Sequence, residues 1–308
     1  MQYGSRERFD YGECAECGTL QIKVVPEDLA RHYRQDRYAS WRDVPAYVDK
    51  PLGSAGRWLR AARARHQIDG SGSVGALVKY ALGAPEMPDT GVWAWLRAAG
   101  ADPGSRIFDF GCGPGELLRY LRLTGFRRLV GYDMFSGCDM NLPGLRLGGT
   151  MPGPEERFDL VMAHHSLEHI ADPSAALQLL RGLLAPGGTL LVRIPVSQTY
   201  AWRTYGADWI QLDAPRHLFV PSLRGMDQLV AHAGLRLQRR YFDSSNFQFL
   251  GSEQYRREIP MFGDTRSYFD GNVGQFSRGQ AHAWQKQAEQ LNAADDGDQA
   301  CFFLQAAA

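Results

Sequence analysis

Short apolar runs alternate with helical stretches along most of this 308-residue chain. Each run is bounded by turn residues, which is typical of strands that are buried on both faces. Strands that alternate with helices form a parallel, doubly wound sheet with right-handed crossovers. The predicted strands lie at 106–109, 129–133, 158–163, 189–194, 235–242 and 299–304.

The first predicted strand ends at Asp109 and leads into a glycine-rich turn, Gly111-Cys112-Gly113-Pro114-Gly115, before a helix begins. Glycine has no Cβ, so the backbone of such a turn can approach a ligand closely. The next strand ends at Asp133, whose carboxylate can accept hydrogen bonds from both hydroxyls of a ribose. This order of strand, turn, helix and acid predicts a nucleotide-type cofactor site.

Glu116 decides which cofactor the turn favours. A dinucleotide site has a third glycine where this chain has Glu116, and a carboxylate there would repel a pyrophosphate. We therefore disfavour a nicotinamide dehydrogenase. The run resembles motif I of the class I methyltransferases, which bind S-adenosylmethionine, a cofactor without phosphate. The residues that we predict to bind it are Asp109, Gly111, Cys112, Gly113, Gly115, Asp133, Met134 and His164.

Three later motifs extend the resemblance over residues 90–245. They are Phe158-Asp159-Leu160-Val161, then Leu167-Glu168-His169-Ile170-Ala171-Asp172-Pro173, then Leu184-Ala185-Pro186-Gly187-Gly188, which we expect to end a helix. In this order they resemble small-molecule methyltransferases related to the ubiquinone-biosynthesis O-methyltransferases. The resemblance implies an α/β, Rossmann-like, doubly wound sheet whose last strand is antiparallel. Only residues 134–157 lie between Asp133 and Phe158, so the third strand region is expected to be abbreviated.

One segment precedes the predicted methyltransferase domain and another is inserted within it. Residues 1–88 are predicted to be an N-terminal extension, with helices and a single Cys14-x-x-Cys17 pair. A structural zinc needs four ligands and the chain has no second such pair, so we predict no metal. Residues 89–308 are predicted to form the methyltransferase domain, in which 249–298 is an insertion. An insertion of this length is expected to be a lid over the acceptor or a contact in a homodimer.

Histidines near the predicted site are the candidate bases for removing a hydroxyl proton. We assign catalytic roles to His165, Glu168 and His217, with His165 or His217 as the base. The ubiquinone O-methyltransferases that the chain resembles have Glu-x-x-Glu-His here, thought to hold a divalent metal. This chain has His165 at the first position, and an imidazole there favours zinc or another transition metal over magnesium.

The loop at 195–221 supplies the evidence on the acceptor. It contains Tyr200, Trp202, Tyr205 and Trp209, and this density of rings suits stacking on a sugar. The segment Asp213-Ala214-Pro215-Arg216-His217-Leu218-Phe219 also resembles bacterial members associated with surface-glycan or sugar modification. The sequence therefore predicts O-methylation of a sugar, a glycan or a related small-molecule hydroxyl. Two alternatives stay open, a quinone or phenol O-methyltransferase and a non-catalytic S-adenosylmethionine-binding partner subunit.

The composition of the chain indicates which kinds of partner the protein has and where in the cell it is found. Thirty-four basic residues balance 34 acidic residues, so the chain lacks the basic excess of most nucleic-acid-binding enzymes. No apolar run has the length of a membrane span, and the charged start is unlike a signal peptide. The five cysteines are scattered and do not form a disulfide framework. We expect a cytoplasmic protein that acts on a small-molecule or glycan acceptor without contacting nucleic acid or membrane.

Overall fold

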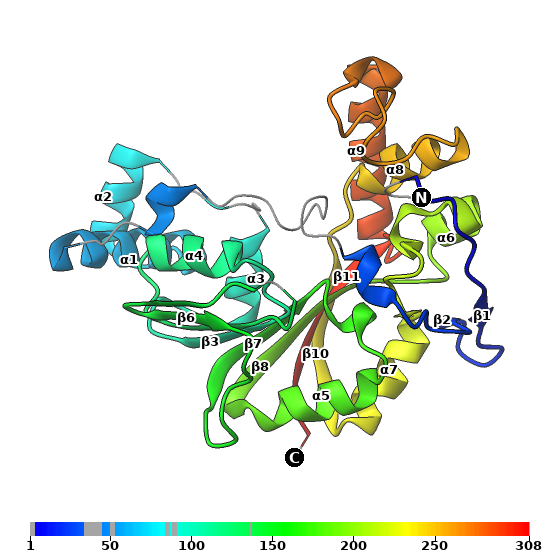
Figure 1. Cartoon of the computed structure of the whole chain (residues 1–308). Coiled ribbons are helices and arrows are strands. Elements are labelled where there is room, and N and C mark those ends of the chain that lie inside the picture. The colour runs from blue at the N-terminus through cyan, green and yellow to red at the C-terminus, as the bar shows by residue number, and fades with distance from the viewer. Residues whose placement is uncertain are drawn as a thin grey trace.

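A computed structural model describes residues 4–33, 45–49, 53–83, 87, 91–135 and 137–307. Its centre is an eight-stranded sheet in the order β10-β11-β8-β7-β3-β4-β6-β5 (Figure 1). The strands are β3 (Arg106–Phe110), β4 (Arg128–Tyr132), β5 (Met140–Leu142), β6 (Leu145–Gly148), β7 (Phe158–His164), β8 (Leu184–Pro195), β10 (Leu235–Phe242) and β11 (Gln299–Ala306). The predicted α/β, doubly wound sheet is confirmed.

Strand directions follow the class I methyltransferase pattern. Pairs β8/β7, β7/β3, β3/β4 and β4/β6 are parallel, whereas β11 runs antiparallel to both of its neighbours, β8 and β10. All six predicted strands are present. The prediction that the last strand is antiparallel is therefore confirmed.

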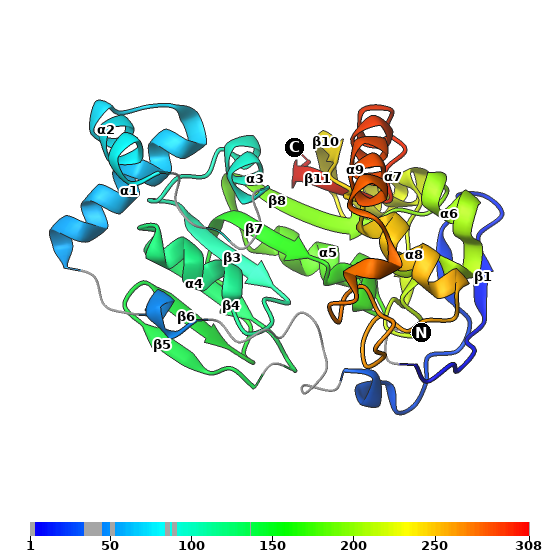
Figure 2. The same cartoon turned by 90° about the horizontal axis from the view of Figure 1, so that it is seen from above.

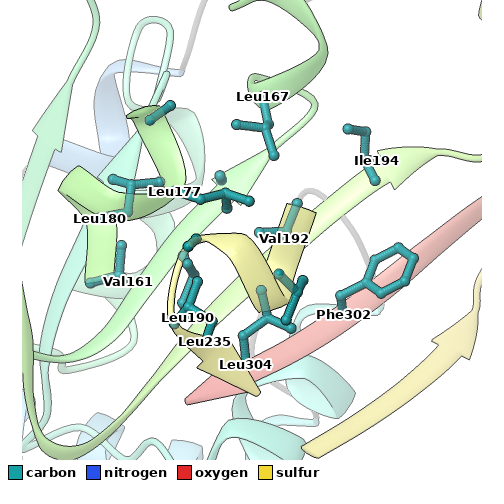
Figure 3. Close-up of a cluster of buried hydrophobic side chains, with 14 of the residues drawn as sticks. Val161, Leu167, Leu177, Leu180, Leu190, Val192, Ile194, Leu235, Phe302 and Leu304 are labelled. Carbon is teal, nitrogen blue, oxygen red and sulfur yellow. The ribbon is translucent and has the colours of Figure 1, made fainter. Parts of the chain in front are cut away.

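Helices cover both faces of the sheet (Figure 2). On one face, α5 (Pro173–Gly182) and α7 (Leu223–His232) bury apolar side chains against the strands. Asp172 caps α5 by accepting a hydrogen bond from the backbone N–H of Ala175, and Pro173 occupies the first turn. Figure 3 shows this core, in which Leu177 and Leu180 of the helix meet the strand residues. The opposite face is covered by α1 (Ser54–Asp69), α3 (Val92–Ala99) and α4 (Glu116–Leu123).

The region of the third strand is abbreviated, as predicted. In the described residues between β4 and β6 the chain forms no helix and instead makes a short hairpin, in which β5 pairs antiparallel with β6. Gly144 makes the turn with φ +87°. The residues after β6, Gly149 and Thr150, offer no carboxylate at this edge of the sheet.

One local prediction is wrong. The segment 184–188 does not end a helix, because α5 already ends at Gly182 and β8 begins at Leu184. Leu184 pairs with Phe158, while Thr189 pairs with Leu160, so the residues between them bulge out of the register. Gly187 has φ +75°, which allows the chain to turn out and return to the strand. The Pro-Gly-Gly sequence therefore marks an irregularity within a strand.

The N-terminal segment pairs with the domain that follows it. Strands β1 (Tyr11–Glu13) and β2 (Leu20–Ile22) form a hairpin, and β2 pairs with β9 (Phe219–Val220) in a three-stranded sheet. The turn of this hairpin holds the Cys14-x-x-Cys17 pair, whose thiols are free. Further elements of the segment are the 3-10 helices η1 (Leu29–His32) and η2 (Ala46–Asp49), followed by α1 and α2 (Ser73–Leu82).

Most of the remaining elements contribute side chains to a third apolar cluster, and η4 and η6 lie among them in the chain. They are α6 (Tyr200–Tyr205), η4 (Gly206–Asp208), η5 (Ile210–Leu212), α8 (Phe247–Arg256), η6 (Val273–Gln275) and α9 (Arg278–Ala293). Figure 1 shows α8 and α9 on the side of the molecule where α6 lies. Among the described residues, no helix has the length and hydrophobicity needed to cross a membrane.

Candidate functional site

The loops after β3, β4 and β7 enclose a cleft at the edge where these parallel strands end. The cleft has a volume of about 330 Å³, within the range of small-ligand sites. This is the edge at which open α/β sheets bind ligands. The cleft is lined by Tyr33, Asp109, Phe110, Gly111, Cys112, Gly113, Pro114, Glu116, Leu117, Tyr132, Asp133, Met134, Phe135, His164, His165, Ser166, His169 and Ile170.

The glycine turn is shaped by contacts that a side chain would block. Gly111 has φ +75°, and a Cβ there would overlap the side chain of Ser166. Gly115 has φ +76° and precedes the first residue of α4. A Cβ on Gly115 would overlap Leu147, so this glycine lets the helix begin close to the sheet. Gly115 is the one predicted cofactor residue that does not line the cleft.

Two carboxylates stand on the floor of the cleft. Asp133 accepts hydrogen bonds from the backbone N–H groups of Gly113 (2.9 Å) and Phe135 (2.8 Å), which fixes both the turn and the loop after β4. Asp109 is buried at the end of β3, and burial together with the charge of Asp133 raises its pKa to about 8. Burial also raises the pKa of the neighbouring Cys112 thiol, so this cysteine stays protonated. The site is therefore suited to a ligand that brings a positive charge and hydroxyl donors.

His164 and His165 follow each other at the end of β7 but differ in environment. Both ring nitrogens of His164 are buried and have no hydrogen-bond partner, and its ring centroid lies 4.7 Å from that of Trp95. Burial and the charge of Arg193 hold the pKa of His164 well below its usual value. His165 has φ +47°, a left-handed conformation that is rare for a residue with a Cβ and is found at many functional sites.

The ring of His165 is held between the carboxylate of Glu168 and the guanidinium of Arg193. Its Nδ1 lies 3.2 Å from Oε1 of Glu168, and its Nε2 lies 2.9 Å from Nη1 of Arg193. A guanidinium can only donate, so Nε2 accepts and Nδ1 carries the proton that is donated to Glu168. Arg193 is itself paired with Asp243, its Nε 2.6 Å from Oδ2. This arrangement orients the imidazole and leaves its lone pair directed at Arg193.

Glu168 and His217 lie behind the cleft. Glu168 is fully buried; burial alone would raise its pKa, but the hydrogen bond from His165 and the nearby histidines lower it to about 2. His217 is 5% exposed and its Nδ1 lies 2.7 Å from the carbonyl oxygen of Gln211. The ring of His169 packs edge-on against it at 4.8 Å and separates it from the cleft. Of the three predicted catalytic residues, only His165 lines the cleft.

A group that could ligate a metal lies at the same place. Ligand atoms of Glu168, His169 and His217 lie within 4.8 Å of one another, and Oε2 of Glu168 has no partner. Nδ1 of His169 is occupied by the Tyr33 hydroxyl (3.0 Å) and the Arg216 carbonyl (2.9 Å), so its Nε2 is the atom free to ligate. His165, which we considered for this role, is bonded instead to Glu168 and Arg193.

Burial of His217 makes folding stability depend on pH. Burial lowers its pKa to about 4, from 6.5 in the unfolded chain. The stabilisation is thus complete above pH 6.5 and is lost as the pH falls from 6.5 to 4, a loss of about 3 kcal/mol. Urea unfolding at pH 7 and pH 4.5 should show this loss in the wild type. The variant His217→Asn should show a smaller one, and equal pH dependence in both proteins would contradict the assignment.

Tyr33 was not anticipated from the sequence, although it lines the cleft. It belongs to the N-terminal segment, directly after η1, and stacks on Phe135 with ring centroids 5.7 Å apart. Its hydroxyl reaches His169 on the other side of the cleft. No motif surrounds Tyr33, and it is held here by contacts between distant segments, among them the pairing of the N-terminal hairpin with β9 and the contact of its hydroxyl with His169.

The aromatic loop is not placed as predicted. Tyr200, Trp202, Tyr205 and Trp209 belong to the third apolar cluster, together with residues of α8 and α9. Trp209 is fully buried and its Nε1 donates a hydrogen bond to Asp298 (3.0 Å). None of these four rings lines the cleft, and neither does any described residue of 249–298. The rings stabilise the packing of the insertion and are not positioned to stack on an acceptor in the cleft.

Comparisons with known proteins find similarity to methyltransferases. Residues 92–239 match the model of the family described as "Methyltransferase domain". A ubiquinone biosynthesis O-methyltransferase from Cereibacter sphaeroides is 34% identical over 132 residues, which are 37% of this chain and 51% of that protein. The one from Dinoroseobacter shibae is 34% identical over 134 residues, 37% of this chain and 52% of that protein. The chain spans about half the length of these curated relatives.

Among solved structures, an S-adenosylmethionine-dependent methyltransferase from Mesorhizobium loti has a TM-score of 0.44 and 14% identity. The match covers 70% of this chain and 97% of that one. A match at this level adds nothing to the strand order and strand directions described above.

Proposed function

We propose that this chain, whose residues 92–239 match the methyltransferase domain family, transfers the methyl group of S-adenosylmethionine to a hydroxyl oxygen of a small molecule. The observation that carries the proposal is the pair of carboxylates, Asp109 and Asp133, on the floor of a cleft built around a glycine turn. No phosphate is accommodated easily here, because Glu116 lines the same cleft. When bound, the cofactor supplies a methyl group already activated on a sulfonium.

The residues of the cleft fit this cofactor. The buried carboxyl of Asp109, whose pKa is about 8, is a partner for the ammonium of the methionine end. Asp133 already accepts two backbone hydrogen bonds, and its oxygens have further lone pairs for the ribose hydroxyls. Met134 and Phe135 are exposed at the rim, where they offer an apolar surface to the adenine ring. We therefore assign the ammonium to Asp109, the ribose to Asp133 and the adenine to the rim.

His165 is the base in this proposal. Glu168 fixes the tautomer in which Nδ1 carries the proton, so the proton of the acceptor hydroxyl goes to Nε2. The lone pair of Nε2 faces Arg193 and becomes available only when this contact opens. Glu168 acts through His165 and is a positioning residue. His217, buried behind His169, has no path to an acceptor in the cleft.

A phenol or quinol hydroxyl is the acceptor that we favour over a sugar. The argument for a sugar rested on the aromatic loop, and those rings are packed under α8 and α9. The curated relatives named above are O-methyltransferases of ubiquinone biosynthesis, which supports an acceptor of that kind. Their matched region is about half of each relative, so the acceptor is a proposal for this chain.

Transfer of a labelled methyl group tests the function directly. The protein is incubated with methyl-labelled S-adenosylmethionine and, separately, phenols, quinols, nucleotide sugars and oligosaccharides. We expect label in the phenol and quinol fractions, and none with the variant Asp133→Ala. Label in the carbohydrate fractions would overturn the acceptor class and restore the sugar. If the cofactor binds and no fraction is labelled, the chain is a non-catalytic cofactor-binding subunit.

A further inference from the structure

The helices α1 and α2 form a helical hairpin that lies outside the region matched by the methyltransferase family. We call residues 53–83, which are the two helices and the turn between them, the helical hairpin. α1 is anchored to the domain, because Ala64 and Ile68 are buried in its core. Arg60 of α1 also donates a hydrogen bond to the carbonyl oxygen of Leu123 (3.2 Å). Figures 1 and 2 show the helical hairpin at one end of the molecule, away from α8 and α9.

α2 is attached to the rest of the molecule mainly through α1. Gly75 is the only buried residue of α2. A Cβ at this position would overlap the carbonyl oxygen of Ala62, so glycine lets the two helices approach closely. The remainder of α2 is apolar on almost every side, with Lys79 as its only charged residue. A helix that is apolar all round is usually covered on all sides, yet α2 is covered mainly on the side of α1.

The helical hairpin concentrates the exposed apolar side chains of the protein. Six of the twelve large apolar side chains that are exposed in the described part of the chain belong to it: Trp58, Leu59, Val74, Leu77, Tyr80 and Leu82. Leu77, Tyr80 and Leu82 are 68, 92 and 70% exposed, so most of each side chain is in contact with water. Exposed apolar side chains that gather in this way mark an interaction surface.

The helical hairpin also carries an excess of positive charge. Its basic residues are Arg57, Arg60, Arg63, Arg65 and Lys79, and its one acid is Asp69. Its net charge is therefore +4, whereas the whole chain is neutral. Nε of Arg63 is buried without a hydrogen-bond partner. Burial and the charge of Arg60 lower the pKa of Arg63, so the positive charges of α1 repel one another. An anionic partner would relieve this repulsion.

A hollow beside α1 adds two further arginines to this surface. The hollow has a volume of about 310 Å³, and its lining includes Trp58, Arg65, Arg127 and Arg128. Arg65 is paired with Asp102 (3.2 Å). Arg127 and Arg128 are exposed and form no ion pair with any residue that the structure describes. The hollow therefore offers an indole ring next to two guanidinium groups that can bind a phosphate.

We propose that the helical hairpin docks the protein on the surface of an anionic phospholipid membrane. In the docked state Leu77 and Leu82 enter the boundary of the acyl chains, and Trp58 lies at the headgroup level that tryptophan prefers. Lys79, Arg127 and Arg128 bind lipid phosphates, and each basic residue raises the affinity for an anionic surface about fivefold. No described helix has the length and hydrophobicity to cross a membrane, so the protein lies on the surface.

Two other partners fit these observations less well. A second copy of the chain would make a two-fold contact, in which two hairpins of net charge +4 face each other. A nucleic acid would pair with the guanidinium groups but would leave Leu77 and Leu82 exposed to water. The composition of the whole chain predicts no contact with a membrane. That prediction averages over a local excess of charge, which basic and acidic residues elsewhere in the chain cancel.

Co-sedimentation with lipid vesicles tests the docking without turnover, so its result is independent of the proposed methyl transfer. The vesicles are phosphatidylcholine alone and phosphatidylcholine mixed with phosphatidylglycerol. We expect the full chain to bind the mixed vesicles at least about tenfold more tightly than the neutral ones. Binding to the mixed vesicles should fall as the salt concentration rises, because salt screens the attraction between the basic residues and the lipid phosphates.

Two variants, each with a matched control, test the apolar and the basic parts of the surface separately. Leu77→Ser should weaken vesicle binding about tenfold, because serine gains little from leaving water. Leu179→Ser removes an exposed leucine from α5 and should change nothing. Lys79→Glu should weaken binding about 25-fold, since it removes one attraction and adds one repulsion. Lys286→Glu makes the same change of charge on the exposed side of α9 and should have a much smaller effect.

All four variants should keep the wild-type thermal stability and affinity for S-adenosylhomocysteine. Vesicle binding that is lost in the two hairpin variants and kept in their controls supports the docking surface. Equal binding to both vesicle types, binding to neither, or equal losses in a variant and its control would overturn it. A lipid-free dimer that Leu77→Ser dissociates would instead assign the surface to a second copy. Binding of single-stranded RNA without binding of vesicles would assign it to a nucleic acid, and either result refutes the membrane.

Discussion

Replacing His165 by alanine is expected to lower turnover by about 10²- to 10³-fold, the usual contribution of a well-placed general base. The affinity for S-adenosylhomocysteine should change by less than about threefold, because Asp109 and Asp133 hold the cofactor in our assignment. The reason for the large effect is that the lone pair of His165 Nε2 is prepared for a proton. Glu168 fixes the tautomer from one side, and Arg193 fixes the ring from the other.

Steady-state kinetics and calorimetry on the same preparations separate the two effects. His232→Ala is the matched control. This histidine is exposed at the end of α7, so its replacement should change neither turnover nor cofactor affinity. Glu168→Gln should lower turnover less than His165→Ala, because it removes the orienting charge and leaves the imidazole. Turnover of His165→Ala within threefold of the wild type would show that the base lies elsewhere. The second predicted base, His217, would then be tested in the same way.

The sequence predicts those parts of the site whose residues lie close together in the chain. Asp109, the glycine turn and Asp133 lie in two adjacent strands and the turn between them, so sequence order alone brings them together. Gly111 and Gly115 have positive φ, which glycine adopts without strain, so the turn is visible in the sequence itself. The strands are predictable from sequence because a parallel strand that is buried on both faces is a short apolar run.

The residues that the structure places away from the cleft, and the one that sequence missed, all depend on contacts between distant segments. The sequence predicts that Trp209 stacks on an acceptor, because it does not show that Asp298 accepts the indole N–H. The sequence predicts His217 as an alternative base, and the structure buries it against the ring of His169. Tyr33 reaches the cleft through contacts with segments far along the chain, such as the pairing of β2 with β9, almost 200 residues later. Burial decides the role of each residue, and burial is set by partners that local pattern cannot identify.

Four polar residues that the register places side by side, His164, Arg193, Cys301 and Tyr241, show the same limit. Arg193 and Tyr241 occur in strands that were predicted correctly, yet neither was a candidate from the sequence. Each is a single polar residue in a strand, which is common on exposed faces. Only the register, which places them in one line with His164, reveals that they share a buried face.

Cofactor binding should release a proton and should weaken steeply at low pH. The pKa of Asp109 is about 8 in the free protein, because it is buried next to Asp133. A bound ammonium stabilises the carboxylate, so the cofactor binds the ionised form. Below pH 8 the protein must lose this proton first, and the apparent affinity for S-adenosylhomocysteine falls by up to about tenfold per pH unit. Between pH 8 and pH 6 the fall is therefore up to about 100-fold.

Calorimetry in buffers of different ionisation enthalpy measures the proton directly. Methylthioadenosine is the matched ligand, because it has the adenosine and lacks the ammonium; its affinity should be nearly constant over this range. Asp109→Asn should bind S-adenosylhomocysteine more weakly and with little dependence on pH. A wild-type affinity that stays constant from pH 6 to pH 8 would mean that Asp109 does not face the ammonium. The buried carboxyl would then need another partner, and the orientation that we assign to the cofactor would be wrong.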